Sequence, residues 1–282
     1  MPNAKIRRAI LGASLGALAL SGLPAQAQEA LDALKEQGFA RIAIANEPPF
    51  TAVNSDGSVS GAAPDVARAV FKRLGVDDVV ASISEYGAMI PGLQARRFDA
   101  VTAGLFMKPE RCAAVAYSEP VLCDAEAFLL KAGNPHGLKS YKDIADNAEV
   151  RIGAPGGGTE ERLALEAGVP RDRVIVVPDA QSGLTMLQQG RIDVYSLPVL
   201  SINALAGQAN DATLEVVAPV EGAPVYCDGA AFRKDQTELR DAFDRELAAI
   251  KASGEFAQII EPYGFSAQAA MSTTREKLCA QQ

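Results

Sequence analysis

Strand-like and helix-like segments alternate along this chain in two successive cycles, and this order constrains the fold more than any other feature. In the first cycle, helical patterns at 64–74 and 89–95 separate apolar strand patterns at 41–45, 79–83, 98–102 and 125–131. Strands interleaved with helices are typical of α/β domains with parallel strand pairing. The first cycle therefore predicts one α/β lobe.

The second cycle repeats this order further along the chain, with expected helices at 141–144, 160–167 and 182–189 and expected strands at 150–154, 173–177 and 192–197. A strand at 226–232 and a helix at 239–253 would return the chain to the first lobe. Two strand-like crossovers, near 125–130 and 222–228, would then form a hinge beside a cleft. We expect an α/β protein with two mixed sheets flanked by helices, with lobe 1 at 28–125 and 226–282 and lobe 2 at 126–225.

The N-terminus carries the three-part pattern of a secretory signal peptide. Lys5, Arg7 and Arg8 precede an apolar run over 9–23, and Ala25-Gln26-Ala27 is an A-x-A cleavage site. A membrane anchor is the alternative, but the run is shorter than the roughly 20 residues that span a bilayer. We expect cleavage after residue 27, a mature chain beginning near Gln28, and release into the periplasm.

The charge balance argues against a nucleic-acid partner. The chain has 27 Lys and Arg against 35 Asp and Glu, a net charge of −8, and loss of the leader would remove three further positive charges. An acidic surface is repelled by phosphate backbones. We therefore expect no nucleic acid among the partners.

The cysteines and the single histidine predict no metal site and no cofactor. Cys112, Cys123, Cys227 and Cys279 include no C-x-x-C pair, so neither a redox motif nor a zinc site is indicated. In an oxidising compartment they can pair, and Cys123 would meet Cys227 if both lie on neighbouring crossovers. His136, in an Asn-Pro-His-Gly turn, is expected in a solvated loop.

Three consecutive glycines, Gly156–Gly158, precede an expected helix and invite comparison with nucleotide-binding loops. The segment lacks both the lysine of a P-loop and G-x-G-x-x-G spacing. Close approach of the backbone to a small ligand is the better interpretation.

Several motifs, in order along the chain, resemble those of the bacterial family 3 solute-binding proteins. They are Gly92–Ala100, Lys108-Pro109-Glu110-Arg111, Tyr117-Ser118-Glu119-Pro120, Leu187–Asp193, and Lys251–Phe256 followed by Tyr263-Gly264. Each motif is weak alone, but the ordered set covers nearly the whole mature chain. The resemblance implies the type II periplasmic-binding-protein fold, which closes on small amino-acid-like solutes and delivers them to the membrane subunits of an ABC permease.

Compared with the family pattern, this chain keeps one ligand-binding residue and lacks another. Arg111 occupies the place of the arginine that binds the ligand's carboxylate, and a guanidinium can grip a carboxylate with two hydrogen bonds. Amino-acid binders usually carry an aspartate for the α-ammonium five residues after the Gly-x-x-Asp aspartate, where this chain has Pro198. This departure argues against an ordinary α-amino acid as ligand.

Glu47, in a loop directly after the first strand, is the candidate partner for a ligand cation. Three aromatic residues in loops could surround the same cation: Phe50, Tyr86 and Phe106. Cation–π contacts contribute about 0.5–2 kcal/mol each. The order of these residues resembles the pocket pattern of the ectoine and hydroxyectoine binders within the family. The resemblance implies that Arg111 and the hydroxyl of Thr159 bind the carboxylate and that Glu47 binds the amidinium. The expected binding set is Glu47, Phe50, Tyr86, Gly104, Phe106, Arg111, Gly158 and Thr159.

Two other functions stay open from the sequence. The first is binding of another zwitterion, such as an amino acid, proline or a betaine. The second is a dehydratase-type enzyme on the same fold with Glu47 as base, although general acid–base catalysis needs a second placed group that the sequence does not reveal. We expect a monomeric binding protein with no catalytic residues.

Overall fold

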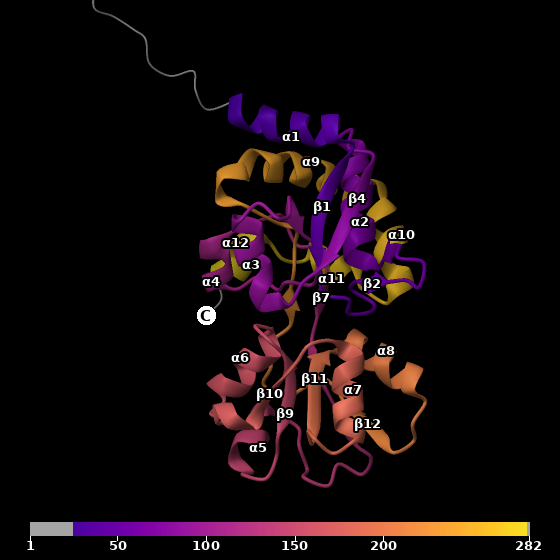
Figure 1. The fold of residues 1–282 in the computed structure, drawn as a ribbon, viewed down its shortest axis with the longest axis vertical. Helices are drawn as coiled ribbons and strands as arrows, with labels where there is room; N and C mark the ends of the chain where they lie inside the picture. The colour runs from indigo at the N-terminus through magenta and orange to yellow at the C-terminus, as the bar shows by residue number, and fades with distance from the viewer. Residues whose placement is uncertain (1–24, 281–282) are drawn as a thin grey trace, which may run out of the picture.

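The computed structural model describes residues 25–280, which form two α/β lobes stacked one above the other (Figure 1). We call the first sheet with its helices lobe 1 and the second sheet with its helices lobe 2. The two-lobed fold with mixed sheets confirms the expected fold class.

The sheet of lobe 1 has the strand order β4-β1-β5-β14-β6. Strand β1 pairs in parallel with β4 and β5, whereas β14 runs antiparallel between β5 and β6. The bounds are β1 Phe39–Ile44, β4 Asp78–Ile83, β5 Ala100–Val101, β6 Ala116–Tyr117 and β14 Ala231–Phe232. A small ribbon of β2 (Ala52–Val53) and β3 (Val59–Ser60) lies beside this sheet.

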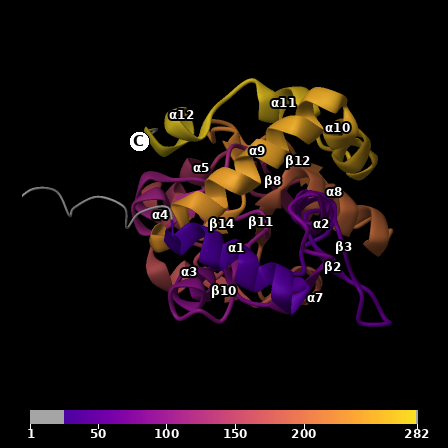
Figure 2. The ribbon, with the colours of Figure 1, turned by 90° about the horizontal axis from the view of Figure 1, so that it is seen from above.

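The helices of lobe 1 come from both ends of the chain. Helices α1 and α9 lie side by side above the sheet (Figure 2). As expected from its apolar spacing, α9 buries Phe243, Leu247 and Ile250. The bounds are α1 Ala25–Gln37, α2 Ala62–Arg73, α3 Tyr86–Gln94, α4 Pro109–Ala114, α9 Thr237–Ser253, α10 Glu255–Ile260, α11 Ala267–Met271 and α12 Arg275–Ala280.

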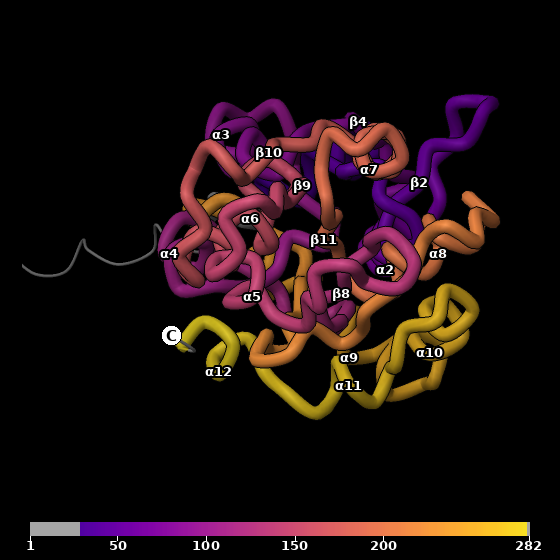
Figure 3. Tube along the Cα trace, turned by 90° about the horizontal axis from the view of Figure 1, so that it is seen from below, coloured from indigo at the N-terminus to yellow at the C-terminus, as the bar shows by residue number. Residues whose placement is uncertain are grey.

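The sheet of lobe 2 has the strand order β10-β9-β11-β8-β12, with β8 antiparallel to both of its neighbours. Figure 3 shows α5 and α6 on one side of this sheet and α7 and α8 on the other. Alternate residues of β8 face opposite sides, as in any strand: Phe128 and Leu130 pack with α5 and α6, Ala127 and Leu129 with α7 and α8. The bounds are β8 Glu126–Lys131, α5 Tyr141–Asp146, β9 Ile152–Pro155, α6 Thr159–Glu166, β10 Val174–Val177, α7 Ala180–Gln188, β11 Val194–Pro198, α8 Val199–Ala209 and β12 Leu214–Val217.

Two short antiparallel strands connect the lobes, β7 (Cys123–Asp124) and β13 (Tyr226–Cys227). Cys123 and Cys227 are paired in register and form a disulfide, which confirms the predicted meeting of these residues. A second disulfide joins Cys112 to Cys279. We propose lobe boundaries close to residues 125 and 226, because β7 and β13 lie at these points.

The prediction of one continuous strand over 226–232 was wrong. The structure divides it into β13 and β14, separated by Asp228, Gly229 and Ala230. Buried Asp228 turns inward to accept a hydrogen bond from the Leu122 amide at 2.7 Å. A Cβ at Gly229 would come within 2.7 Å of Met107 Cε, so the chain passes too close to its neighbours for an ordinary strand residue.

The predicted signal peptide lies almost entirely outside the described residues, apart from its last three positions, which open α1. Within residues 25–280, no helix combines the length and the apolarity that a membrane span requires. His136 is exposed, as expected for a loop residue.

Candidate ligand-binding site

The carboxyl ends of the parallel strands in both sheets meet between the lobes, where ligands bind in open α/β sheets. In lobe 1, Glu47 follows β1 and Tyr86 follows β4. In lobe 2, Thr159 follows β9 and Ser201 follows β11. The topology therefore brings loops that are far apart in sequence to one interlobe site.

Glu47 is the central acid of this site. Its side chain is buried, with Oε1 accepting a hydrogen bond from Ser201 Oγ at 2.8 Å and Oε2 accepting one from the Tyr86 hydroxyl at 3.3 Å. Burial raises the pKa of Glu47 to about 8, and repulsion from Glu160 adds to this, while the two hydroxyl hydrogen bonds oppose it. A buried carboxylate that is costly to ionise is suited to a cationic partner.

Two of the three predicted aromatic residues are packed more deeply than the third. Phe50 and Phe106 are 1% and 2% exposed and contact edge-to-face, with ring centroids 6.0 Å apart. Phe50 also packs on Phe265, and Phe106 stacks on Tyr226. Tyr86 is half-buried, and its single hydroxyl hydrogen is shared between Ala103 O at 2.9 Å and Glu47 Oε2 at 3.3 Å. Phe50 and Phe106 thus belong to one aromatic group with Phe265 and Tyr226, whereas Tyr86 is the ring that contacts the acid.

Gly104 makes room for this aromatic group. Its φ of +75° lies in the left-handed region, and a Cβ there would come within 2.8 Å of Phe50 Cδ1. Both the backbone conformation and the approach of the ring require glycine.

Arg111 bridges the two lobes from α4. Its Nη1 donates to Phe106 O at 2.9 Å in lobe 1, and its Nη2 donates to Gly157 O at 2.8 Å in lobe 2. A guanidinium has five N–H donors, so these two bonds leave donors for a ligand carboxylate. Gly158 is the N-cap residue of α6 and Thr159 opens that helix, buried at 3% exposure.

Three buried charged residues near this site were missed by the sequence reasoning. Lys108, Glu126 and Glu160 are exposed by no more than 4%. Burial lowers the pKa of Lys108 to about 7, with Arg111 contributing, and burial raises the pKa of Glu126 and of Glu160. Lys108 lies in the Lys-Pro-Glu-Arg motif and Glu160 directly follows Thr159, so their closeness in sequence to predicted site residues was a signal that could have identified them. No sequence signal pointed to Glu126.

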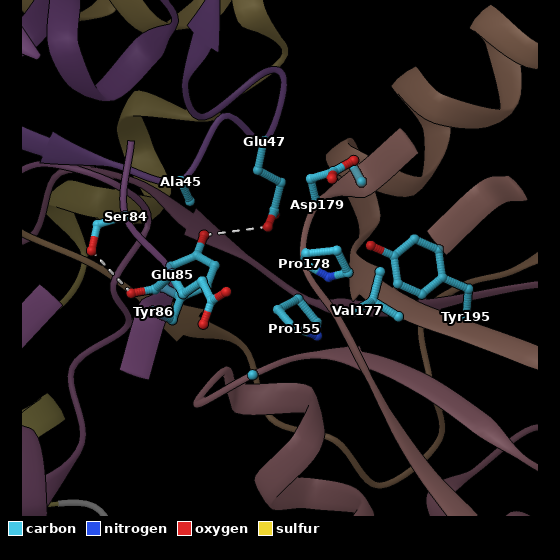
Figure 4. Close-up of a pocket in the computed structure, with 12 residues that line it drawn as sticks. Ala45, Glu47, Ser84, Glu85, Tyr86, Pro155, Val177, Pro178, Asp179 and Tyr195 are labelled. Carbon is cyan, nitrogen blue, oxygen red and sulfur yellow. Dashed lines mark hydrogen bonds between the residues drawn. The ribbon is translucent and has the colours of Figure 1, made fainter. Parts of the chain in front are cut away.

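A pocket opens between the lobes beside Glu47 and Tyr86 (Figure 4). Of the eight predicted site residues, only these two line it. The other six do not line it, and their part in binding stays a prediction: Phe50, Gly104, Phe106, Arg111, Gly158 and Thr159. The lining residues are Ala45, Glu47, Ser84, Glu85, Tyr86, Pro155, Gly156, Val177, Pro178, Asp179, Ala180 and Tyr195.

Comparison with known families settles the class of the protein. Residues 40–266 match the bacterial extracellular solute-binding proteins, family 3. The chain belongs to this family. The motifs quoted from the sequence therefore identified it correctly, and as a solute-binding protein it is built to hold a small molecule between its lobes.

Individual relatives agree with this assignment. A probable amino-acid ABC transporter periplasmic-binding protein of Sinorhizobium fredii is 33% identical over 89% of this chain and 86% of its own length. The crystal structure of EhuB in complex with hydroxyectoine is similar at 82% identity, with a TM-score of 0.89 over 89% of this chain and 98% of that one. An ancestral amino acid-binding protein, described as a precursor of cyclohexadienyl dehydratase, is 25% identical with a TM-score of 0.72 over 83% of this chain and 98% of its own.

Proposed function

We propose that this solute-binding protein captures ectoine and hydroxyectoine in the periplasm and delivers them to an ABC permease. The observation that carries the proposal is the 82% identity, over 98% of its chain, to EhuB, whose structure contains hydroxyectoine. Two contacts between the lobes also support it, because buried Glu47 accepts a hydrogen bond from Ser201 and Arg111 donates to Gly157 O.

Each end of the solute has a proposed partner. Ectoine is a cyclic zwitterion with a carboxylate and an amidinium. Arg111 would bind the carboxylate with its remaining donors, helped by Thr159 and the first amides of α6. Glu47 would accept hydrogen bonds from the amidinium, and Tyr86, Phe50 and Phe106 would surround the ring and the cation.

Binding would favour the closed arrangement of the lobes. A ligand shifts a conformational equilibrium only by its differential contacts with the two states. Here Glu47 and Tyr86 belong to lobe 1 and Thr159 to lobe 2, so a solute touching all three is held best when the lobes close. The closed monomer would then dock on the permease, and the bound solute would leave unchanged.

Isothermal titration calorimetry on the mature protein, stripped of ligand, tests this proposal. The panel contains ectoine, hydroxyectoine, glycine betaine, proline and the common amino acids. Saturable heat from the two ectoines and little from the others is expected. Heat from an amino acid alone would overturn the proposed solute, and conversion of a bound solute into a new product would indicate the dehydratase-type alternative.

Substitution of Arg111 tests the carboxylate assignment. The Arg111→Ala variant should bind hydroxyectoine at least about 30-fold more weakly, because truncating one partner of a buried charged pair costs about 2–5 kcal/mol. Arg73→Ala is the matched control, since Arg73 forms ion pairs with Glu246 and Glu255 within lobe 1. Near-normal affinity of Arg111→Ala would contradict the assignment.

A further inference from the structure

Ser201 contacts the central acid from the opposite lobe. It lies in the first turn of α8, is 2% exposed, and donates its hydroxyl to Glu47 Oε1 at 2.8 Å. Glu47 follows β1 of lobe 1 and Ser201 lies in α8 of lobe 2, so this hydrogen bond crosses from one lobe to the other.

The start of α8 is held in place by the crossover between the lobes. The Leu200 amide donates to Asp124 Oδ2 at 2.9 Å, and the Val199 amide donates to Ala125 O at 2.9 Å. Pro198 is the N-cap residue and is itself buried. The hinge therefore fixes the turn of helix that presents Ser201 to Glu47.

The two hydroxyl donors reach Glu47 from different lobes. An ionised carboxylate has about four lone-pair sites, and the hydroxyls of Tyr86 and Ser201 each occupy one, on different oxygens. Two sites are then left for a cationic N–H donor. Tyr86 belongs to the same lobe as Glu47, whereas Ser201 reaches the acid from lobe 2.

We infer that Ser201 is a positioning residue for the cation subsite, whose hydroxyl orients Glu47 and stabilises its charged form as the lobes close. The inference rests on the proposed function, in which Glu47 accepts hydrogen bonds from a cationic solute. A neutral donor from lobe 2 serves this purpose where an acid at the start of α8 would repel Glu47.

The surroundings of Glu47 give the inference a pH signature. The ionisable groups that most affect it are Tyr86 from α3, Asp124 from β7, Glu126 from β8, Glu160 from α6 and Tyr195 from β11, and Glu85 and Asp179 line the same pocket. None of them is a cation, so Glu47 depends on hydroxyl donors until a solute arrives. Below its pKa of about 8 the carboxyl group carries a proton and is a poor acceptor for a cation. Affinity should therefore rise as the pH rises through this value and level off above it.

Calorimetry with hydroxyectoine between pH 6 and pH 9.5 tests the inference on four proteins. Loss of the Ser201 hydrogen bond would raise the pKa of Glu47 further, since this bond lowers it. Ser201→Ala should bind about tenfold more weakly near pH 7, as expected for a lost hydrogen bond to a charged group, and its rise in affinity should move to higher pH. The wild type sets the reference profile. Glu47→Gln should lose the rise of affinity with pH that the Glu47 carboxyl group causes. Any rise that remains in this variant belongs to another group, such as Lys108.

The matched control is Ser196→Ala. Ser196 is a fully buried serine of lobe 2 whose hydroxyl bonds to Tyr141 rather than to Glu47. It should lose stability as any buried serine does while keeping the affinity and the pH profile of the wild type.

The outcomes separate the inference from the proposed function. Ser201→Ala with wild-type affinity, or with an equal loss at every pH, would overturn the role of Ser201. Failure of wild type to bind either ectoine would overturn the proposed function. The same comparison with whichever cationic solute does bind would then decide the role of Ser201.

Discussion

At the scale of single residues, Gly157 lets the two lobes meet backbone to backbone. The Gly87 amide donates to Gly156 O at 3.1 Å across the cleft. Gly157 has a φ of +73°, and a Cβ there would come within 2.5 Å of Gly87 Cα. Because backbone atoms cannot give way as a flexible side chain can, any larger residue at this position should hold the lobes apart.

The Gly157→Ala variant should therefore bind hydroxyectoine at least about tenfold more weakly, since a left-handed alanine costs roughly 1–2 kcal/mol and the contact with Gly87 adds to this. Gly168→Ala is the matched control, because Gly168 has a φ of +96° but no atom within 4 Å of the added Cβ. Both variants should lose similar thermal stability, measured by differential scanning calorimetry. Equal affinities of the two variants in titration calorimetry would show that the contact with Gly87 does not matter for closure.

Motifs could place residues from sequence, although the binding roles of these residues stay predictions. Glu47 and Arg111 follow recognisable segments, and the structure places both between the lobes. Ser201 was missed because a serine inside an apolar helix carries no mark of what it faces; only the packing of α8 against the opposite lobe shows this. The depth of Phe50 and Phe106 was also beyond the sequence, since it depends on contacts with Phe265 and Tyr226 far along the chain.

At the scale of elements, the disulfide between Cys112 and Cys279 ties α4 to the C-terminal helix α12. Helix α4 is six residues long, has no side-chain cap, and carries Arg111 directly before Cys112. The anchor of α12 is itself firm, because Arg275 donates to Asp244 Oδ2 and to Tyr117 O, both at 2.7 Å. The disulfide thus limits the movement of the turn that holds Arg111.

Replacing Cys112 and Cys279 by serine should lower the free energy of unfolding by about 2–5 kcal/mol, as for other native disulfides, and should also weaken hydroxyectoine binding. Urea unfolding and titration calorimetry measure the two effects. A variant with Cys123 and Cys227 replaced by serine is the companion, because that disulfide joins the crossovers rather than α4. A stability loss with unchanged affinity in the first variant would show that Arg111 does not depend on this tether.

Elements with strong periodicity were predicted within a few residues, among them β4, α6, β10 and α9. Helix α8 and strand β12 were missed. The run over 199–209 has no polar cap at its start, since Pro198 occupies the N-cap position, and it is apolar on most sides. The short strand β12 is an edge strand of half-buried residues whose pairing with β8 gives it its form. Tertiary contacts, rather than local pattern, define both elements.

At the scale of the whole molecule, hydrogen bonds and an ion pair join the two lobes, so the structure shows them closed on each other. Arg111 donates to Gly157 O, Ser201 donates to Glu47, and Arg162 Nη1 lies 2.9 Å from Glu110 Oε1. The pair of Arg162 and Glu110 is partly exposed and contributes little on its own. A solute that adds contacts to both lobes should decide the balance between open and closed forms.

Small-angle X-ray scattering should therefore show a decrease in the radius of gyration when hydroxyectoine is added to ligand-free protein. Gly157→Ala should show a smaller decrease at the same saturation, and Gly168→Ala should match the wild type. An unchanged radius of gyration in the wild type on saturation would mean that the lobes are already closed without solute.

The position of β14 in the first sheet has a consequence for how the chain is assembled. In space, strand β14 lies between β5 and β6 of the first sheet. In the sequence, its residues Ala231 and Phe232 come after every strand of the second sheet. A chain that emerges N-terminus first can complete lobe 2 while lobe 1 still has a gap in its interior. Truncation anywhere before residue 231 would leave that gap open, so the half of the molecule that begins first must be the half that is finished last.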